Sequence, residues 1–138
     1  MSESQSLEIV RRAFDAFAHR DVEGMLPLFD ADAEFHAPTA ERANRSGPYR
    51  GEDGLRQYFS DVERVWEELR VIPQDFREIG DQVLVMGRVY ARGHGGYIVD
   101  SPAQWVFRLL GEKVVFVRVF EDRDAALKAV GLEGEKAH

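Results

Sequence analysis

The sequence predicts an α+β fold in which helices come first and a mainly antiparallel sheet follows. Apolar residues recur at helical spacing before residue 70, whereas the chain after residue 70 alternates and is broken by short glycine turns. The 138 residues are 44% hydrophobic and 31% charged, which is typical of one globular unit. We therefore expect a single domain over residues 1–138.

Three helices are expected in the N-terminal half. The first covers about Gln5 to His19, and the second is short, with Asp21 as its N-cap and Pro27 as a kink or early end. The third opens at Glu52, where acidic groups suit the helix dipole. Its apolar stripe is Leu55, Tyr58, Phe59, Val62, Trp66 and Leu69.

A short strand, 33–37, and a long loop, from Pro38 to Gly51, separate the second and third helices. Ordered loops of this length are uncommon and are often functional, although a mobile surface loop is an equal alternative. The expected later strands are Val71–Ile79, Gln82–Arg92, Tyr97–Val99, Gln104–Leu110 and Val114–Glu121. A short helix, Ala125–Val130, ends at Gly131.

The last two strands form a hairpin around Gly111 and Glu112, because glycine at the first loop position suits a type II′ turn. A register that runs unbroken from this turn pairs Gln104 with Val119. One face of the hairpin is then aromatic, and three helices leave it uncovered, so we expect a homodimer through this outer face. Its aromatic residues are Trp105, Phe107, Phe116 and Phe120.

Composition excludes several classes of function. The net charge of −7 argues against a nucleic-acid partner. The sequence has no cysteine and only four scattered histidines, and it lacks the glycine-rich loops that hold nucleotides, so we expect neither a metal nor a cofactor. No apolar run approaches the roughly 20 residues of a membrane span. The polar N-terminus is unlike a signal peptide, and we expect no membrane contact and a cytoplasmic location.

One pair of residues in the hairpin suggests chemistry. The unbroken register puts Glu121 on a valine face, diagonal to Gln104. A carboxylate that loses water there has a raised pKa, as a general base near neutral pH requires. The alternative is a solvated Glu121 at the end of the strand. Gln104 and Tyr58, the latter from the third helix, are expected to polarise a ligand oxygen, whereas strand parity points His36 away from the pocket.

An internal pocket between the helices and the sheet is expected to take a small apolar molecule. Tyr49, in the long loop, is expected to close over its mouth. The other residues expected to line it are Phe14, Phe35, Phe59, Val62, Trp66, Val106, Val117 and Val119.

Motifs along most of the chain carry a family resemblance. They are Val10–Phe14, Asp21–Gly24, Phe29–Pro38, Tyr49–Leu55, Gly80–Val85, Phe120–Arg123, Ala126-Leu127 and Gly131-Leu132. With these motifs the chain resembles the SnoaL-like polyketide cyclases of the nuclear transport factor 2-like superfamily. The resemblance implies three N-terminal helices packed in a strongly curved sheet, a cone with an apolar pocket, and a short C-terminal helix. It also implies dimerisation through the outer sheet face.

The catalytic residues of related enzymes do not transfer. Compared with the ketosteroid isomerases, the chain has Ala37 where their base precedes a proline, Ala13 for their tyrosine and Gln104 for their acid. The Arg-x-Asp of similar epoxide hydrolases is absent, and Glu121 is a loose match to the base of the cyclases. Two hypotheses stay open. One is an enzyme that abstracts a proton from a carbonyl-bearing molecule, and the other is a non-catalytic dimeric binding module.

Overall fold

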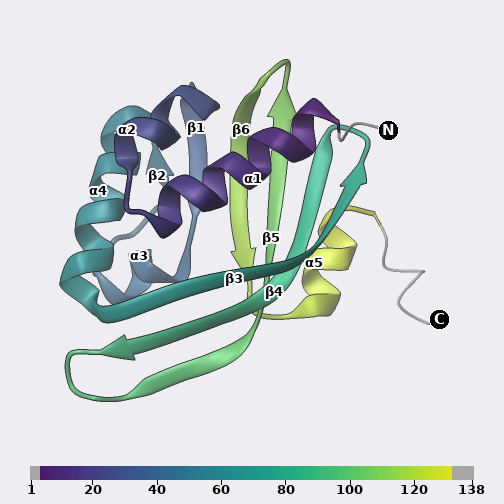
Figure 1. The fold of residues 1–138 in the computed structure, drawn as a ribbon. Helices are drawn as coiled ribbons and strands as arrows, with labels where there is room; N and C mark the ends of the chain where they lie inside the picture. The colour runs from purple at the N-terminus through teal and green to yellow at the C-terminus, as the bar shows by residue number, and fades with distance from the viewer. Residues whose placement is uncertain (1–3, 132–138) are drawn as a thin grey trace.

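The computed structural model describes residues 4–131 (Figure 1). Met1–Glu3, which belong to the expected domain, and the C-terminal residues from Leu132 to His138 lie outside the described residues. The helices are α1 (Gln5–Ala18), α2 (Val22–Met25), the 3₁₀ turn η1 (Leu26–Leu28), α3 (Pro38–Arg42), α4 (Gly51–Val65) and α5 (Arg123–Ala129). The strands are β1 (Phe29–His36), β2 (Tyr49–Arg50), β3 (Trp66–Ile79), β4 (Gln82–Gly93), β5 (Ile98–Leu110) and β6 (Lys113–Phe120).

The six strands form one open, curved sheet in the order β2-β1-β6-β5-β4-β3. The pairing of β1 with β6 is parallel and all other pairs are antiparallel. Helix α1 crosses one face of the sheet, and the long strands β3 and β4 curl beneath it (Figure 1). We call the face that packs against α1 the inner face. The predicted α+β class with a short C-terminal helix is confirmed.

Local signals fix the ends of the N-terminal helices. The Ser4 hydroxyl caps α1 by accepting a hydrogen bond from the amide of Leu7 at 3.2 Å. Asp21 caps α2 in the same way, and Pro27 lies in η1 where the helix was predicted to break. The chain leaves α1 through Arg20, which has a φ of +53° and donates to the Leu69 carbonyl at 2.5 Å. This bond ties the end of α1 to β3.

Two expectations about the middle of the chain are wrong. The segment from Pro38 to Gly51 is not one loop, because it contains α3 and β2. The apolar stripe of the third helix does not continue to Leu69, because α4 ends at Val65 and Trp66 begins β3. Pairing of β3 with β4 along twelve register positions outweighs the helical spacing of these residues.

The predicted hairpin register holds only near its turn. Gly111 has a φ of +64°, as the first position of a type II′ turn requires, and Leu109 pairs with Val114. A bulge then leaves Val115 without a partner, so that Gln104 pairs with Phe120 instead of Val119. The prediction is wrong by one residue beyond the bulge, and a shift of one residue moves β6 side chains to the other face.

The bulge redistributes the aromatic residues between the two faces. Trp105 and Phe107 lie on the inner face, where their rings are 5.2 and 5.6 Å from the ring of Phe14 in α1. The outer face carries Phe116 and Phe120. Helix α5 covers part of that outer face, where a second apolar cluster forms from Leu84, Val106, Phe120, Ala126, Leu127 and Val130. The single uncovered aromatic face expected from the sequence is therefore wrong.

Candidate functional site

The concave side of the sheet encloses two neighbouring cavities of about 40 and 90 Å³. The smaller lies under α1 and the larger lies toward α3 and the ends of β4 and β5. They share the side chains of Tyr58, Val71 and Trp105, which form a common wall. Phe14, Phe35 and Val117 line the smaller cavity, and Trp66 and Val119 line the larger one, as the sequence predicted.

Tyr58 is the polar group at the centre of this region. Helix α4 directs it inward, where it is 6% exposed. Its ring stacks on that of Phe17 with centroids 5.6 Å apart and meets the ring of Phe35 edge to face at 4.5 Å. Burial raises its pKa, so the phenol stays protonated near neutral pH. Its hydroxyl has no hydrogen-bond partner within residues 4–131. The site thus holds a neutral donor with nothing to donate to.

Helix α3 closes one side of the larger cavity. The Thr39 hydroxyl accepts a hydrogen bond from the Trp66 indole at 3.2 Å, which fixes α3 against the start of β3. Arg42, one turn further on, lies with its guanidinium carbon 4.9 Å from the Trp66 ring centre. Thr39, Arg42 and Ser101 supply polar groups to a cavity wall that is otherwise mostly apolar.

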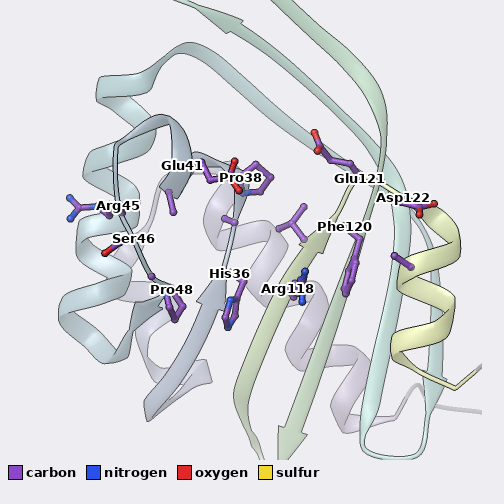
Figure 2. A pocket seen from close by; sticks show the side chains of 15 residues that line it. His36, Pro38, Glu41, Arg45, Ser46, Pro48, Arg118, Phe120, Glu121 and Asp122 are labelled. Carbon is purple, nitrogen blue, oxygen red and sulfur yellow. The ribbon is translucent and has the colours of Figure 1, made fainter.

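An outer cleft of about 650 Å³ lies beside the larger cavity (Figure 2). Its walls are the segment from His36 to Pro48, the end of β6 and the start of α5. In Figure 2, Pro38 and Glu121 lie near one end of the cleft, with His36 and Arg118 on neighbouring strands. Four residues line both the outer cleft and the larger cavity, so the two spaces adjoin: Ala37, Pro38, Val119 and Glu121.

Glu121 lies just beyond the end of β6 and is solvent-exposed. The prediction that Glu121 is desolvated is therefore wrong. The alternative, a solvated Glu121 at the end of the strand, is correct as far as its exposure is concerned. Glu121 nevertheless lines the same cavity as Tyr58. The bulge brings it there, because the shifted register places Val119 and Glu121 beside Trp105 on the inner side.

Gln104 is not part of this site. It pairs with Phe120 on the outer face, so the predicted diagonal contact with Glu121 is wrong. It is 4% exposed, and its Oε1 atom has no hydrogen-bond partner among the residues that the structure describes. Val106 also lies on the outer face, against α5, and not in the pocket. The physical reason for both corrections is the bulge at Val115.

Three other predicted lining residues are buried but lie outside both cavities. Phe59 and Val62 pack in the main core, where the Phe59 ring is 5.5 Å from that of Phe17. Tyr49 does not cover a mouth, because it lies in β2 with 3% of its surface exposed. Its hydroxyl donates to Asp61 at 2.7 Å, and burial followed by this hydrogen bond raises its pKa.

Asp61 is a buried charge that the sequence reasoning missed. It is fully buried on α4 and accepts hydrogen bonds from Arg45, Tyr49, Gln57 and Arg64. The bond from Arg45 is the main reason that the pKa of this carboxyl lies well below its usual range. The network fastens the chain between α3 and β2 onto α4. The sequence feature that could have indicated a buried Asp61 is its position between Tyr58 and Val62, which both belong to the apolar stripe of the helix.

Two further observations concern metal ions and membranes. Within residues 4–131, no cluster of three side chains is arranged to hold a metal ion. The helices of that part of the chain are all too short or too polar to cross a membrane.

The sequence profile of the SnoaL-like domain family matches residues 10–127. The chain belongs to the SnoaL-like domain family. Its fold is that of the nuclear transport factor 2-like proteins, as a solved structure from Burkholderia pseudomallei K96243 shows. That protein, of unknown function, is 22% identical, with 94% of this chain and 99% of that chain covered and a TM-score of 0.78.

Two more solved structures show the same SnoaL-like fold. TerC, co-crystallized with polyporic acid, is 23% identical over 92% of this chain and 98% of its own, with a TM-score of 0.77. A protein from Jannaschia sp. CCS1, assigned as a SnoaL-like polyketide cyclase, is 20% identical over 94% and 96% of the two chains, with a TM-score of 0.70. A comparison with curated proteins gives no match.

Proposed function

We propose that this SnoaL-like protein binds a small, apolar, carbonyl-bearing molecule in the paired cavities beneath α1 and α4. The observation that carries the proposal is the hydroxyl of the buried side chain Tyr58, a donor that has no hydrogen-bond partner within residues 4–131 and faces cavities whose walls are otherwise mostly apolar. A purely apolar ligand that filled the cavities would leave this donor without a bond, whereas a ligand oxygen accepts its hydrogen bond. The solved complex of TerC with polyporic acid supports a small-molecule role for this fold.

The two cavities are too small to hold an ordinary ligand separately. Cavities of about 40 and 90 Å³ are smaller than the roughly 300–1,000 Å³ of ordinary ligand sites. The common wall of Tyr58, Val71 and Trp105 is what separates them. Binding therefore moves this wall and joins the two spaces, with Tyr58 at the junction and its hydroxyl on the ligand oxygen.

A matched pair of probes tests the hydrogen bond. Acetophenone carries a carbonyl oxygen, and α-methylstyrene has the same shape with a methylene group instead. We expect acetophenone to shift the methyl NMR signals of Val71 and Val117, and to bind about fivefold or more tightly than α-methylstyrene, as one buried hydrogen bond predicts. Tyr58→Phe should abolish this preference. Equal binding of the two probes to the wild type, or no binding of acetophenone, would overturn the proposal.

A second candidate function is proton abstraction from the bound molecule, because Glu121 and Tyr58 line the same cavity. In this step the Glu121 carboxylate takes the proton from the carbon beside the carbonyl. The electron pair of the C–H bond forms a C=C bond while the π pair of the carbonyl moves to its oxygen, and the resulting enolate keeps the hydrogen bond from Tyr58. Return of a proton from Glu121 to carbon completes an isomerisation or an exchange with solvent.

Exchange of the acetophenone methyl protons in D₂O, followed by NMR, measures this chemistry without knowledge of the natural substrate. We expect exchange above the buffer rate with the wild type and none with Glu121→Gln. Glu41→Gln is the matched control, because Glu41 lines the outer cleft but not the cavity of Tyr58. If acetophenone binds yet the wild type gives only the buffer rate, the protein is a binding module and not this kind of enzyme.

Dimerisation through the outer face is part of the proposal. Phe116 is half-buried there, with its ring 5.2 Å from that of His36, and Arg108 and Arg118 flank it. Burial of such a surface stabilises association by roughly 25 cal/mol per Å² before the cost of association. Sedimentation at micromolar concentration should show a dimer, and Phe116→Glu should give monomer or aggregate. Wild-type protein that sediments only as a monomer would refute this.

A further inference from the structure

Arg42 occupies a position that the proposed function does not yet use. It lies in the last turn of α3, it lines the larger cavity, and it is itself exposed at the surface. Its guanidinium carbon is 4.9 Å from the Trp66 ring centre and 5.4 Å from that of Tyr97, and its Nη1 donates to the Tyr97 hydroxyl at 3.1 Å. Aromatic contacts therefore fix the orientation of this cation without neutralising it.

Most other arginines of the described residues pair with carboxylates. Arg45, only three residues further along the chain, is bonded to the fully buried Asp61. Arg70 also lies over a tyrosine ring, 4.8 Å from the centre of Tyr90, but it pairs with Glu68 at 3.0 Å. Arg42 has no such carboxylate partner within residues 4–131, and four of its five N–H donors are left for a ligand.

The depth of the polar groups gives the site a direction. Tyr58 is 6% exposed and lines both cavities, whereas Arg42 is exposed and lines only the larger one. A ligand that places its carbonyl on Tyr58 therefore presents its opposite end to Arg42. Glu121 lines the same cavity and repels an anion beside it, so a negative group of the ligand is favoured at Arg42 and disfavoured at Glu121.

We infer that the ligand of this site is an anion, an apolar keto acid whose carboxylate binds Arg42 while its ketone oxygen accepts a hydrogen bond from Tyr58. This inference rests on the proposed function, because it names the class of molecule that the same cavities take. Arg42 is the specificity-determining residue. The net charge of −7 repels anions at long range, so a preference for the acid has to come from local contacts with this side chain.

Two probes of nearly equal size separate the charge from the shape. 4-Acetylbenzoate carries the ketone and a carboxylate, and 4-acetylbenzamide carries the same ketone with a neutral amide. We expect the wild-type protein to bind the benzoate about tenfold more tightly than the benzamide in low salt, as charge-assisted hydrogen bonds predict. Dissociation constants are read from NMR titration or calorimetry.

Substitutions then assign the preference. Arg42→Gln should lower affinity for the benzoate about tenfold and leave affinity for the benzamide unchanged, which also shows that the variant is folded. Arg42→Lys should keep part of the preference, because lysine supplies the charge without the planar fork. Arg70→Gln is the matched control: it removes an arginine that contacts a tyrosine ring but does not line the cavity, and it should change neither constant.

The outcomes distinguish failure of this inference from failure of the proposed function. If both probes bind wild type equally and Tyr58→Phe weakens both, the ligand site stands and the anion inference is overturned. The inference is also overturned if Arg42→Gln leaves the preference for the benzoate intact. If neither probe binds, the proposed function falls and takes the inference with it.

Discussion

Asp61 and Tyr58 lie one turn apart on α4, and both are buried. The Asp61 carboxylate accepts hydrogen bonds from four side chains, whereas the Tyr58 hydroxyl has no partner within residues 4–131. Tyr49 connects the two regions, because its ring is 5.3 Å from that of Tyr58 while its hydroxyl donates to Asp61.

The difference between Asp61 and Tyr58 helps to distinguish residues that stabilise the fold from residues that bind a ligand. A buried polar group whose partners all come from the chain stabilises the fold, since its removal leaves those partners without a bond. A donor that faces a cavity and has no partner in the described chain adds no such bond to the fold, and it is explained when a ligand supplies the acceptor. On this view Asp61 holds the fold and Tyr58 serves binding, and each claim is open to a direct test.

The largest effect is expected for Asp61→Asn. The substitution removes a charge that Arg45 and Arg64 pair with and that Tyr49 donates to. Breaking a buried ion pair costs about 3–5 kcal/mol, and because both arginines reach solvent we expect the lower end, about 3 kcal/mol. Urea denaturation measures the loss. Glu63→Gln, an exposed acid on the same helix, should change stability by less than about 0.5 kcal/mol.

Acid should remove the same stabilisation without a mutation. The hydrogen bond from Arg45 is the main cause that holds the pKa of folded Asp61 below the value of about 3.9 in an unfolded chain. The unfolded state then binds more protons, so the stabilisation is complete above about pH 5 and is lost as pH falls through 3.9 toward the folded pKa.

The measurement is the difference in unfolding free energy between wild type and Asp61→Asn as a function of pH. We expect this difference to be constant from pH 5 to 7 and to shrink below pH 4, because asparagine does not titrate. A difference that stays constant down to pH 2.5 would contradict the assignment of Asp61 as the titrating group.

Tyr49→Phe tests whether the Asp61 network stabilises the fold, because it removes a single oxygen atom from that network. The variant leaves Asp61 with one donor fewer, and a hydrogen bond to a charged group contributes about 1.5–3 kcal/mol. Since Arg45, Gln57 and Arg64 continue to donate, we expect a loss near 1.5 kcal/mol in urea denaturation. In the Asp61→Asn background the effect should fall by about half, which a double-mutant cycle detects.

Sequence reasoning could predict the class of fold because the deciding signals are local. The capping residues Ser4 and Asp21, the break at Pro27 and the turn at Gly111 all act within a few residues of themselves. Tyr58 was also predicted correctly to face the cavities, since its place in the apolar stripe of α4 fixes its direction.

The errors arise where distant pairings decide. The hairpin turn sets the register of its first pairs, but the bulge at Val115 cannot be read from the turn, and it moved Gln104 away from Glu121. Trp66 continues a helical spacing yet belongs to β3, because pairing with β4 takes it. Asp61 was missed since its partner Arg45 lies 16 residues away in a segment expected to be a loop.

The smallest effect on stability is expected for Tyr58→Phe, and its sign sharpens the comparison most. Both tyrosines are more than nine-tenths buried, but the hydroxyl of Tyr58 bonds to nothing within residues 4–131, so its removal costs no hydrogen bond. Since a phenylalanine ring is less costly to bury than a phenol, the free energy of unfolding in urea should equal that of the wild type or exceed it by up to about 1 kcal/mol. Tyr49→Phe is the matched control, because it removes the same atom from a neighbouring tyrosine whose hydroxyl does donate a hydrogen bond, to Asp61. A loss at Tyr58 equal to that at Tyr49 would show that Tyr58 donates to an internal partner and belongs to the scaffold. A neutral or stabilising change, together with lost preference for acetophenone over α-methylstyrene, is the combination expected of a residue kept for binding.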